Sequence, residues 1–549
     1  MTGTGELHPI YDIAKQLGLA QDDLIGYGKY KAKIPLDVLY SQPRRAKLVL
    51  MTAINPTPFG EGKTTMSIGL AQALTRRGWQ ATAVLREPSL GPTLGMKGGA
   101  TGGGRSSVEP AADINLHFTG DFHAITSAHN LLSALIDNSL YFGQMPSLSA
   151  TRVTWKRVLD MNDRALRNIV IGLGGPGQGI PRQSGFDITA ASEVMAVLAL
   201  AKNRDDLMAR LGRMVIGVGR DNQPVTVDDL GAAPAMAALL DDALMPNLVQ
   251  TTEHTPAIIH GGPFANIAHG CNSVLATEMG LRYSDVIVTE AGFGADLGAE
   301  KFLDIKAQQA DLNPNVAVVV ATLRALKYQG GKSVDAIDAP DLPALQRGFQ
   351  NLQKHVQNLQ KFGLPVVVGI NRFPSDLSEE VHWLRDRLEQ EGVGVEEAEI
   401  FAKGGEGGLA LAQLVEQVMR EQPSSQFRPL YHQELSLPDK IERIAQEIYG
   451  AHAVEYTTEA HKKLQRYEQW GDGHLSVCVA KTQYSLSDDP TRLGRPENFT
   501  LHIRDVEIAR GAGYIVPLAG TMVRMPGLPK KPAAFRVRVN SDGVIEGVR

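Results

Sequence analysis

"AKLVLMTAINPTPFGEGKTTMSIGLAQALTRRG", residues 46–78, places a strand pattern, a loop and a helix pattern in immediate succession. The run over 46–54 is apolar apart from Lys47 and Thr52, which predicts a buried strand. Beyond the loop, apolar residues recur at 66, 70, 73 and 74, the spacing of a helix, and Gly78 is a plausible C-cap. This order is typical of a loop that binds phosphate between a strand and a helix.

The loop itself departs from the usual phosphate-binding pattern, G-x-x-x-x-G-K-[ST]. Gly62, Lys63 and Thr64 supply its second half, whereas Thr57 and Pro58 stand at and after the first-glycine position. We expect Thr57-Pro58 to fix the exit from the strand, and the later glycines to let an anion approach the backbone. Lys63 would supply a mobile charge at the helix N-terminus and Thr64 a ligand for Mg²⁺. A turn that contains GKT by chance is the alternative.

Composition excludes several classes of protein. The chain has 549 residues, of which 43% are hydrophobic and 21% charged, with a net charge of −5, so nothing favours nucleic-acid or membrane-surface binding. The two cysteines, Cys271 and Cys478, are too few for a disulfide framework. The start "MTGTGELHPI" lacks the features of a signal peptide, and no apolar run approaches 18 residues, so we expect a cytoplasmic protein.

Alternating short β-branched runs and helical patterns predict an α/β fold, with a P-loop NTPase-like, mostly parallel sheet flanked by helices. Further strands are predicted at 81–85, 168–173, 285–290, 316–323 and 365–370, and long helices at 190–213 and 380–390. After about residue 465 the runs become shorter and alternate. We therefore predict three parts: a large nucleotide-binding domain (1–364), a second α/β lobe (365–460) and a C-terminal domain with more antiparallel strands (461–549).

Polar residues follow several of these strands, where open α/β sheets bind ligands. Arg86 and Glu87 end the strand at 81–85, and Glu290 ends the strand at 285–290. An arginine there can grip a phosphate or carboxylate through two hydrogen bonds. An acidic residue can orient Mg²⁺ or water. The alternatives are a surface ion pair for Arg86 and a solvated carboxylate for Glu290.

Two further segments carry weaker signals. "GMKGGATGGGRS" (95–106) can bring N–H groups together on an anion or form a moving lid, although a flexible linker explains it too. Residues 113–130 gather three histidines with Asp121 at spacings that match no zinc pattern, so we expect polar lining of a pocket there. In guanine-binding P-loop proteins an N-K-x-D motif follows such a strand. Pro374 occupies the aspartate position of "NRFPSD", which favours ATP over GTP.

Many of these motifs, in this order, resemble formate–tetrahydrofolate ligase, with matches from about residue 50 to the C-terminus. The stretches that carry the resemblance are "TPFGEGKTT", "LREPSLGP", "KGGATGGG", "GFDITAASEVMA", "HGGPFANIAHGCNS", "TEAGFGADLGAEKF", "ATLRALKYQGG", "INRFPSD", "AKGGEGG" and "AKTQYSLSDDP". The length matches the monofunctional bacterial type.

The resemblance implies ligation of formate to the N-10 nitrogen of tetrahydrofolate. ATP, Mg²⁺ and a monovalent cation (K⁺ or NH₄⁺) would take part, with formyl phosphate as the intermediate. It places Lys63 on the transferring phosphoryl group, Arg86 on formyl phosphate, and Phe373 and Phe401 on either side of the folate ring. It also implies a homotetramer. The implied ATP-binding residues are Thr57, Pro58, Phe59, Gly60, Glu61, Gly62, Lys63 and Thr64.

Four positions depart from the family pattern: Thr101, Arg105, Gln329 and Phe401, the last commonly tryptophan. The smaller ring of Phe401 reduces the predicted stacking area. Two alternatives stay open, another P-loop ligase or kinase that acts on a small carboxylate, and a scaffold that has lost catalysis. The retained Lys63, Thr64 and Arg86 argue against the scaffold.

Overall fold

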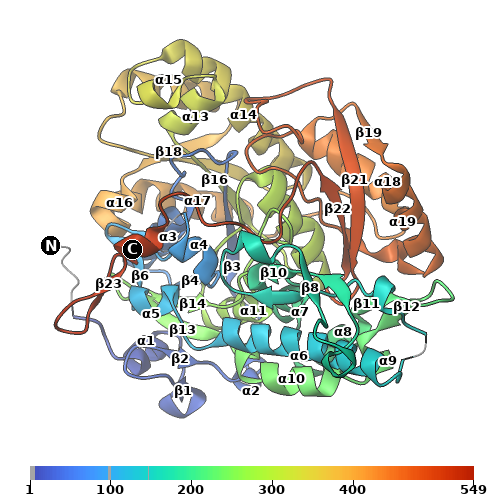
Figure 1. Cartoon of the computed structure of the whole chain (residues 1–549). Coiled ribbons are helices and arrows are strands. Elements are labelled where there is room, and N and C mark those ends of the chain that lie inside the picture. The colour runs from blue at the N-terminus through green and yellow to red at the C-terminus, as the bar shows by residue number, and fades with distance from the viewer. Residues whose placement is uncertain (1–5, 97–99, 146, 549) are drawn as a thin grey trace.

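The computed structural model describes residues 6–96, 100–145 and 147–548, and within them a 12-stranded sheet forms the centre (Figure 1). Its strands are β1 (Ile25–Gly26), β2 (Ala32–Lys33), β3 (Lys47–Ala53), β4 (Ala81–Leu85), β5 (Gly102–Gly103), β6 (Ser106–Glu109), β13 (Asn247–Thr251), β14 (Pro256–Ile259), β15 (Val286–Glu290), β16 (Val316–Ala321), β17 (Val366–Asn371) and β18 (Gly394–Ala398). The order along the main path is β1-β2-β13-β14-β4-β15-β3-β16-β17-β18. All neighbours from β14 to β18 run parallel, whereas β1, β2, β13, β6 and β5 pair antiparallel. The predicted mostly parallel α/β fold is confirmed.

Both faces of this sheet are covered, which explains the continuous apolar runs of its strands. In β3 the alternating residues Leu48 and Leu50 face one core, and Val49 and Met51 face another. The first core includes buried residues of α11 (Val274–Tyr283) and α14 (Leu342–Lys361). The second includes α3 (Lys63–Arg76) and α17 (Leu409–Glu421). The phosphate-loop strand therefore lies in the middle of the molecule, between β15 and β16.

A second, four-stranded sheet lies in the C-terminal part, with the order β19-β21-β22-β20. Its members are β19 (Ala453–Tyr456), β20 (Ser476–Val477), β21 (Thr500–Ala509) and β22 (Tyr514–Ala519). β21 and β22 pair antiparallel, whereas β19–β21 and β20–β22 are parallel pairs. Figure 1 shows this sheet in orange and red, far from β1 and β2 in blue. The domain limits remain predictions; β17 and β18, beyond the first limit, hydrogen bond within the central sheet.

Two predicted elements differ in the structure. The single helix over 190–213 is two helices, α7 (Glu193–Leu200) and α8 (Arg204–Arg213). Ala201 between them is extended, and the side chain of Asn203 accepts the N–H of Asp206 at 2.8 Å, which starts a new helix. The strand predicted over 168–173 is β8 (Ile169–Ile171), which pairs with β9 (Arg182–Ser184) outside the central sheet.

The remaining helices and strands complete the described chain. They comprise helices α1 (Ile10–Gln16), α2 (Leu36–Leu39), α4 (Leu90–Leu94), α5 (Ala111–Asn115), α6 (Asp121–Tyr141), α9 (Val227–Leu230), α10 (Ala233–Leu240), α12 (Gln308–Ala310), α13 (Leu323–Gln329), α15 (Ser378–Gln390), α16 (Ile400–Lys403), α18 (Leu437–Ile444) and α19 (Thr458–Gln469), and strands β7 (Arg157–Leu159), β10 (Phe186–Ile188), β11 (Val215–Val218), β12 (Pro224–Thr226), β23 (Arg538–Val539) and β24 (Ile545–Glu546). Ala295–Ala299, Phe302–Ala307 and Ala445–Tyr449 are π-helical. Within the described ranges, no helix is both long and apolar enough to cross a bilayer.

Candidate active site

The carboxyl ends of the parallel strands share one edge of the sheet, and the predicted site residues follow those ends. The phosphate loop follows β3, Arg86 follows β4, and Glu290 is the last residue of β15. Phe373 and Phe401 follow the neighbouring strands β17 and β18. The fold therefore brings residues that lie more than 300 positions apart in the sequence to a single edge of the sheet.

The phosphate loop is closed by its own acidic residue. Thr57 donates two hydrogen bonds to Glu61 Oε1, from its N–H at 2.8 Å and from its hydroxyl at 2.9 Å. Glu61 is buried, and this desolvation raises the pKa of its carboxyl group. Gly60 and Gly62 both have φ of +73°, a conformation that favours glycine, and Gly62 leads directly into α3. The missing first glycine is thus replaced by a side-chain closure.

Two further contacts hold the loop against neighbouring segments. Lys63 Nζ donates to the carbonyl oxygen of Phe293 at 2.7 Å, in the segment that follows β15. Asn371 Nδ2, at the end of β17, donates to the carbonyl oxygen of Glu61 at 3.1 Å. The contact with Phe293 places the Lys63 ammonium over the edge of the sheet, where a phosphate on the helix N-terminus would lie.

Glu290 lies between Thr64 and Arg86. Its Oε2 accepts the hydroxyl of Thr64 at 2.9 Å, and its Oε1 is 4.0 Å from an Arg86 guanidinium nitrogen. Arg86 also donates to the carbonyl oxygen of Pro263 at 3.4 Å, and its buried Nε has no hydrogen-bond partner among the described residues. The structure therefore brings together the hydroxyl, the carboxylate and the guanidinium predicted from three separate motifs.

Glu87 and Asp121 form a separate, deeper cluster. Asp121 pairs with buried Lys33 at 2.7 Å and accepts Asn247 Nδ2 at 2.7 Å, so both of its oxygens are bonded. Glu87 is buried, and desolvation together with the charge of Asp121 raises its pKa well above the ordinary value. One carboxyl oxygen of Glu87 has no hydrogen-bond partner within the described ranges. Their pocket role remains a prediction.

The two aromatic residues have different surroundings. The guanidinium of Arg324 lies over the ring of Phe373, 4.5 Å from its centroid, and so covers one face. Phe401 is 63% exposed and lies against the glycine-rich segment, where Arg105 N–H donates to its carbonyl oxygen at 3.0 Å. A Cβ on Gly104 would come within 2.0 Å of that oxygen. Only glycine fits there, which ties the glycine-rich segment to the predicted folate site.

Three departures from the family pattern have local partners. Thr101 Oγ1 accepts Asn115 Nδ2 at 3.1 Å, and Gln329 Oε1 accepts the N–H of Gly494 at 2.8 Å. The carbonyl oxygen of Arg105 accepts the hydroxyl of Thr252 at 2.5 Å. These contacts fix loop conformations around the site.

The sequence reading missed a buried polar network beneath the loop. Asn55 Nδ2 donates to Asp296 Oδ1 at 3.3 Å, and Asp296 pairs with Lys481 at 2.8 Å with both side chains fully buried. Asn371 was also missed. Lys481 and Asn371 lie in stretches that carry the family resemblance, "AKTQYSLSDDP" and "INRFPSD". Their position inside those stretches is the sequence feature that could have identified them as site residues.

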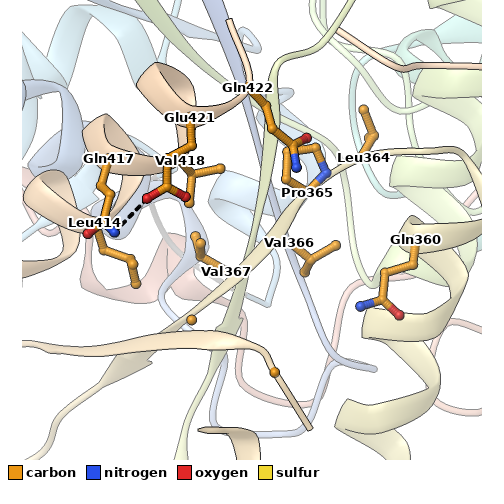
Figure 2. A pocket seen from close by; sticks show the side chains of 12 residues that line it. Gln360, Leu364, Pro365, Val366, Val367, Leu414, Gln417, Val418, Glu421 and Gln422 are labelled. Atoms are coloured by element: carbon orange, nitrogen blue, oxygen red, sulfur yellow. Dashed lines mark hydrogen bonds between the residues drawn. The ribbon is translucent and has the colours of Figure 1, made fainter.

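A cavity of about 360 Å³ lies at the opposite edge of the sheet, where β17 and β18 begin (Figure 2). Figure 2 shows Gln417 and Glu421 on α17, joined by a 2.8 Å hydrogen bond, beside Val367. None of the described residues that line it is a lysine or arginine, so it is unsuited to triphosphate.

At the edge with the phosphate loop, the structure brings together two cationic groups, Lys63 and Arg86, of the kind that neutralise phosphates, and the oxygens of Thr64 and Glu290, of the kind that bind a cation. Among the described residues, no group of three or more His, Cys, Asp or Glu side chains could hold a metal. A magnesium ion there would need phosphate oxygens and water, as it usually does.

Comparison with protein families gives one match that spans essentially the whole chain. Residues 2–549 match the family model described as formate–tetrahydrofolate ligase. Its members are ATP-dependent ligases that form a carbon–nitrogen bond. On this match, and with the phosphate loop, Glu290 and Arg86 at one edge of an α/β sheet, the chain belongs to the formate–tetrahydrofolate ligase family.

Proposed function

We propose that the protein ligates formate to N-10 of tetrahydrofolate through a formyl phosphate intermediate formed at the edge between β3, β4 and β15. The observation that carries this proposal is the position of Glu290, bonded to Thr64 of the phosphate loop and 4.0 Å from Arg86. The loop that would bind the phosphoryl donor and the guanidinium that would bind the phosphorylated acceptor thus lie on either side of one carboxylate, that of Glu290.

The chemistry requires activation because formate is a poor electrophile. In the first step a formate oxygen attacks the γ-phosphorus of ATP, the bond from that phosphorus to the bridging oxygen breaks, and ADP leaves. In the second step the N-10 nitrogen attacks the formyl carbon. The carbon–oxygen bond to phosphate then breaks, the nitrogen loses its proton, and inorganic phosphate is released.

Each step uses charges already in place. Lys63 neutralises the transferring phosphoryl group, and Arg86 binds the phosphate of the intermediate with its planar guanidinium. Both groups are held before reaction, Lys63 by the Phe293 carbonyl and Arg86 beside Glu290, which lowers the reorganisation needed in the transition state. Thr64 and Glu290 would hold Mg²⁺, which would supply further charge neutralisation.

For the second substrate we propose that Phe373 and Phe401 hold the pteridine ring. Arg324 already covers one face of Phe373, and the largely exposed ring of Phe401 is available for stacking. We also propose a monovalent cation requirement, a homotetramer and a cytoplasmic location, which the family resemblance supports.

The test is to measure 10-formyltetrahydrofolate, after acid conversion to the strongly absorbing methenyl form, with ATP, formate and tetrahydrofolate present. ADP release is measured in parallel with and without folate. Product that requires all three substrates supports the proposal. Formate-dependent ADP release with no folate product would instead identify a carboxylate kinase, and no ADP release under any condition would identify an inactive relative.

A further inference from the structure

A second cavity, of about 380 Å³, lies between α14, the π-helical turn Ala445–Tyr449 and the loop that carries Arg495. This volume is within the range of small-molecule sites. Its polar lining includes Lys354, Gln446, His452, Arg495, Glu497 and Asn498. It is distinct from the substrate-binding edge, since no phosphate-loop residue, Arg86, Phe373 or Phe401 lines it.

The cavity wall carries an excess of positive charge close together. Lys354 is 5% exposed, and its ammonium donates to the carbonyl oxygen of Glu447 at 2.7 Å. Burial is the main cause that lowers the pKa of Lys354 to about 8, and the positive charges of Lys361 and Arg495 add to this shift. Arg495 donates to Gln353 Oε1 at 3.3 Å and lies 4.0 Å from the exposed carboxylate of Glu497. Lys354 and Arg495 line the same cavity and repel each other, and an anion bound between them would be attracted by both charges.

We propose that this cavity is a regulatory binding site for inorganic phosphate, held by Lys354 and Arg495. A tetrahedral oxyanion can accept from the ammonium and the guanidinium at once, and the amide groups of Gln446 and Asn498 offer further donors at the wall. Bound phosphate would remove the repulsion that the two side chains now experience.

Residues beside the cavity are connected by hydrogen bonds to Asn55, which precedes the phosphate loop. Next to Lys354 on α14, His355 Nε2 accepts the N–H of Asn55 at 3.1 Å. One turn earlier, Asn351 Nδ2 donates to the Asn55 side-chain oxygen at 2.8 Å and to the carbonyl oxygen of Gly494 at 2.7 Å. Arg495 directly follows Gly494. Each cation is therefore linked to Asn55 through its neighbour in the chain and one or two hydrogen bonds. If phosphate binding shifts these neighbours, phosphate and nucleotide should change each other's affinity equally.

The experiment is calorimetric titration of inorganic phosphate into the whole protein saturated with a non-hydrolysable ATP analogue, which occupies the phosphate loop. We expect wild type to retain a phosphate-binding event. The double variant Lys354→Gln/Arg495→Gln should bind at least ~10-fold more weakly, because two charged hydrogen bonds are lost. Glu497→Gln should bind phosphate more tightly because it removes the competing carboxylate.

The matched control is Arg492→Gln, which removes one positive charge from the same loop outside the cavity and should leave phosphate affinity within about twofold. If the double variant unfolds at a lower temperature than wild type, Arg495→Gln alone is tested instead, because that side chain is 29% exposed and its replacement disturbs the packing less. Wild-type affinity in the double variant, or no phosphate binding once the analogue is bound, would overturn the proposal. Affinity for the ATP analogue that is equal with and without phosphate would overturn the regulatory coupling.

Discussion

Glu61 and Thr57 close the phosphate loop on itself, with one carboxylate oxygen of Glu61 accepting both the N–H and the hydroxyl of Thr57. The usual first glycine allows a tight turn at this point, whereas here a buried, charge-assisted contact fixes the turn. The preorganisation of the triphosphate site therefore depends on a residue that need not touch the nucleotide.

Replacing Glu61 with Ala should raise the KM for ATP about 10- to 150-fold, because hydrogen bonds to a charged group contribute about 1.5–3 kcal/mol. Initial rates at varied ATP measure the effect. Glu61→Gln keeps an acceptor oxygen and should lie between Ala and wild type. An unchanged KM for ATP in Glu61→Ala would show that the closure does not shape the site.

Replacing Lys63 with Ala should lower kcat by at least ~10²-fold and leave the fold intact, because in the proposed mechanism its charge acts chiefly on the transferring phosphoryl group. Ligase rate and thermal melting are measured on the same preparation. A rate within a few-fold of wild type would mean that the loop is an ordinary turn.

Arg86→Ala should abolish scrambling of positionally labelled oxygen in ATP with formate present and folate absent, the signature of reversible formyl phosphate formation. The expected loss is ~10²–10³-fold, with little change in ATP affinity. Arg86→Lys should recover only part of the rate, since an ammonium lacks the planar fork. Scrambling at the wild-type rate in Arg86→Ala would reduce this residue to an ion-pair partner of Glu290.

Phe401→Ala should raise the KM for tetrahydrofolate more than the KM for ATP. By analogy with base stacking at ~1–3 kcal/mol, the expected rise is roughly 5- to 150-fold. Phe401→Trp should tighten folate binding through a larger ring. The control is Phe142→Ala, which removes a ring of similar exposure, 65% against 63%, at the end of α6. Equal folate KM values in Phe401→Ala and wild type would contradict the stacking role.

Glu193→Gln should flatten the pH dependence of stability. Burial raises the pKa of Glu193 from 4.5 to about 7. Its contribution is therefore fully present below pH 4.5 and is lost as the pH rises through 7. At pH 8 the free energy of unfolding of the variant should exceed that of wild type by about 3 kcal/mol, since each pKa unit corresponds to 1.36 kcal/mol. Gln keeps an oxygen to accept the N–H of Gly511, now at 2.8 Å from Glu193. Denaturant titrations at pH 5 and pH 8 measure the difference, and a constant gap would contradict it.

The middle strands of the central sheet, β4, β15, β3, β16 and β17, were predictable because they are buried on both faces and so read as nearly unbroken apolar runs. The short antiparallel strands and β14 and β18 were not predicted. The phosphate loop, Arg86 and Glu290 were predictable for a related reason, since they follow those runs directly. The split between α7 and α8 was not, because the Asn203 cap interrupts an otherwise continuous helical pattern.

The support beneath the site was not predictable from spacing. Asp296 and Lys481 pair in the core although 185 positions separate them, and no local pattern marks either as a partner. The contact between Glu61 and Thr57 is local, but a glutamate in a loop is expected to be solvated, and the burial of Glu61 is visible only in the structure.

The central position of β3 has a consequence for synthesis on the ribosome. Its two neighbours, β15 and β16, begin only at Val286 and Val316, so an apolar strand leaves the exit tunnel with neither edge paired. At ~5–20 residues per second that exposure lasts roughly 10–50 s, long enough for a chaperone to bind. Protease protection of β3 in stalled nascent chains should therefore appear only once β16 has emerged, and protection in shorter chains would show that the strand is sheltered in another way.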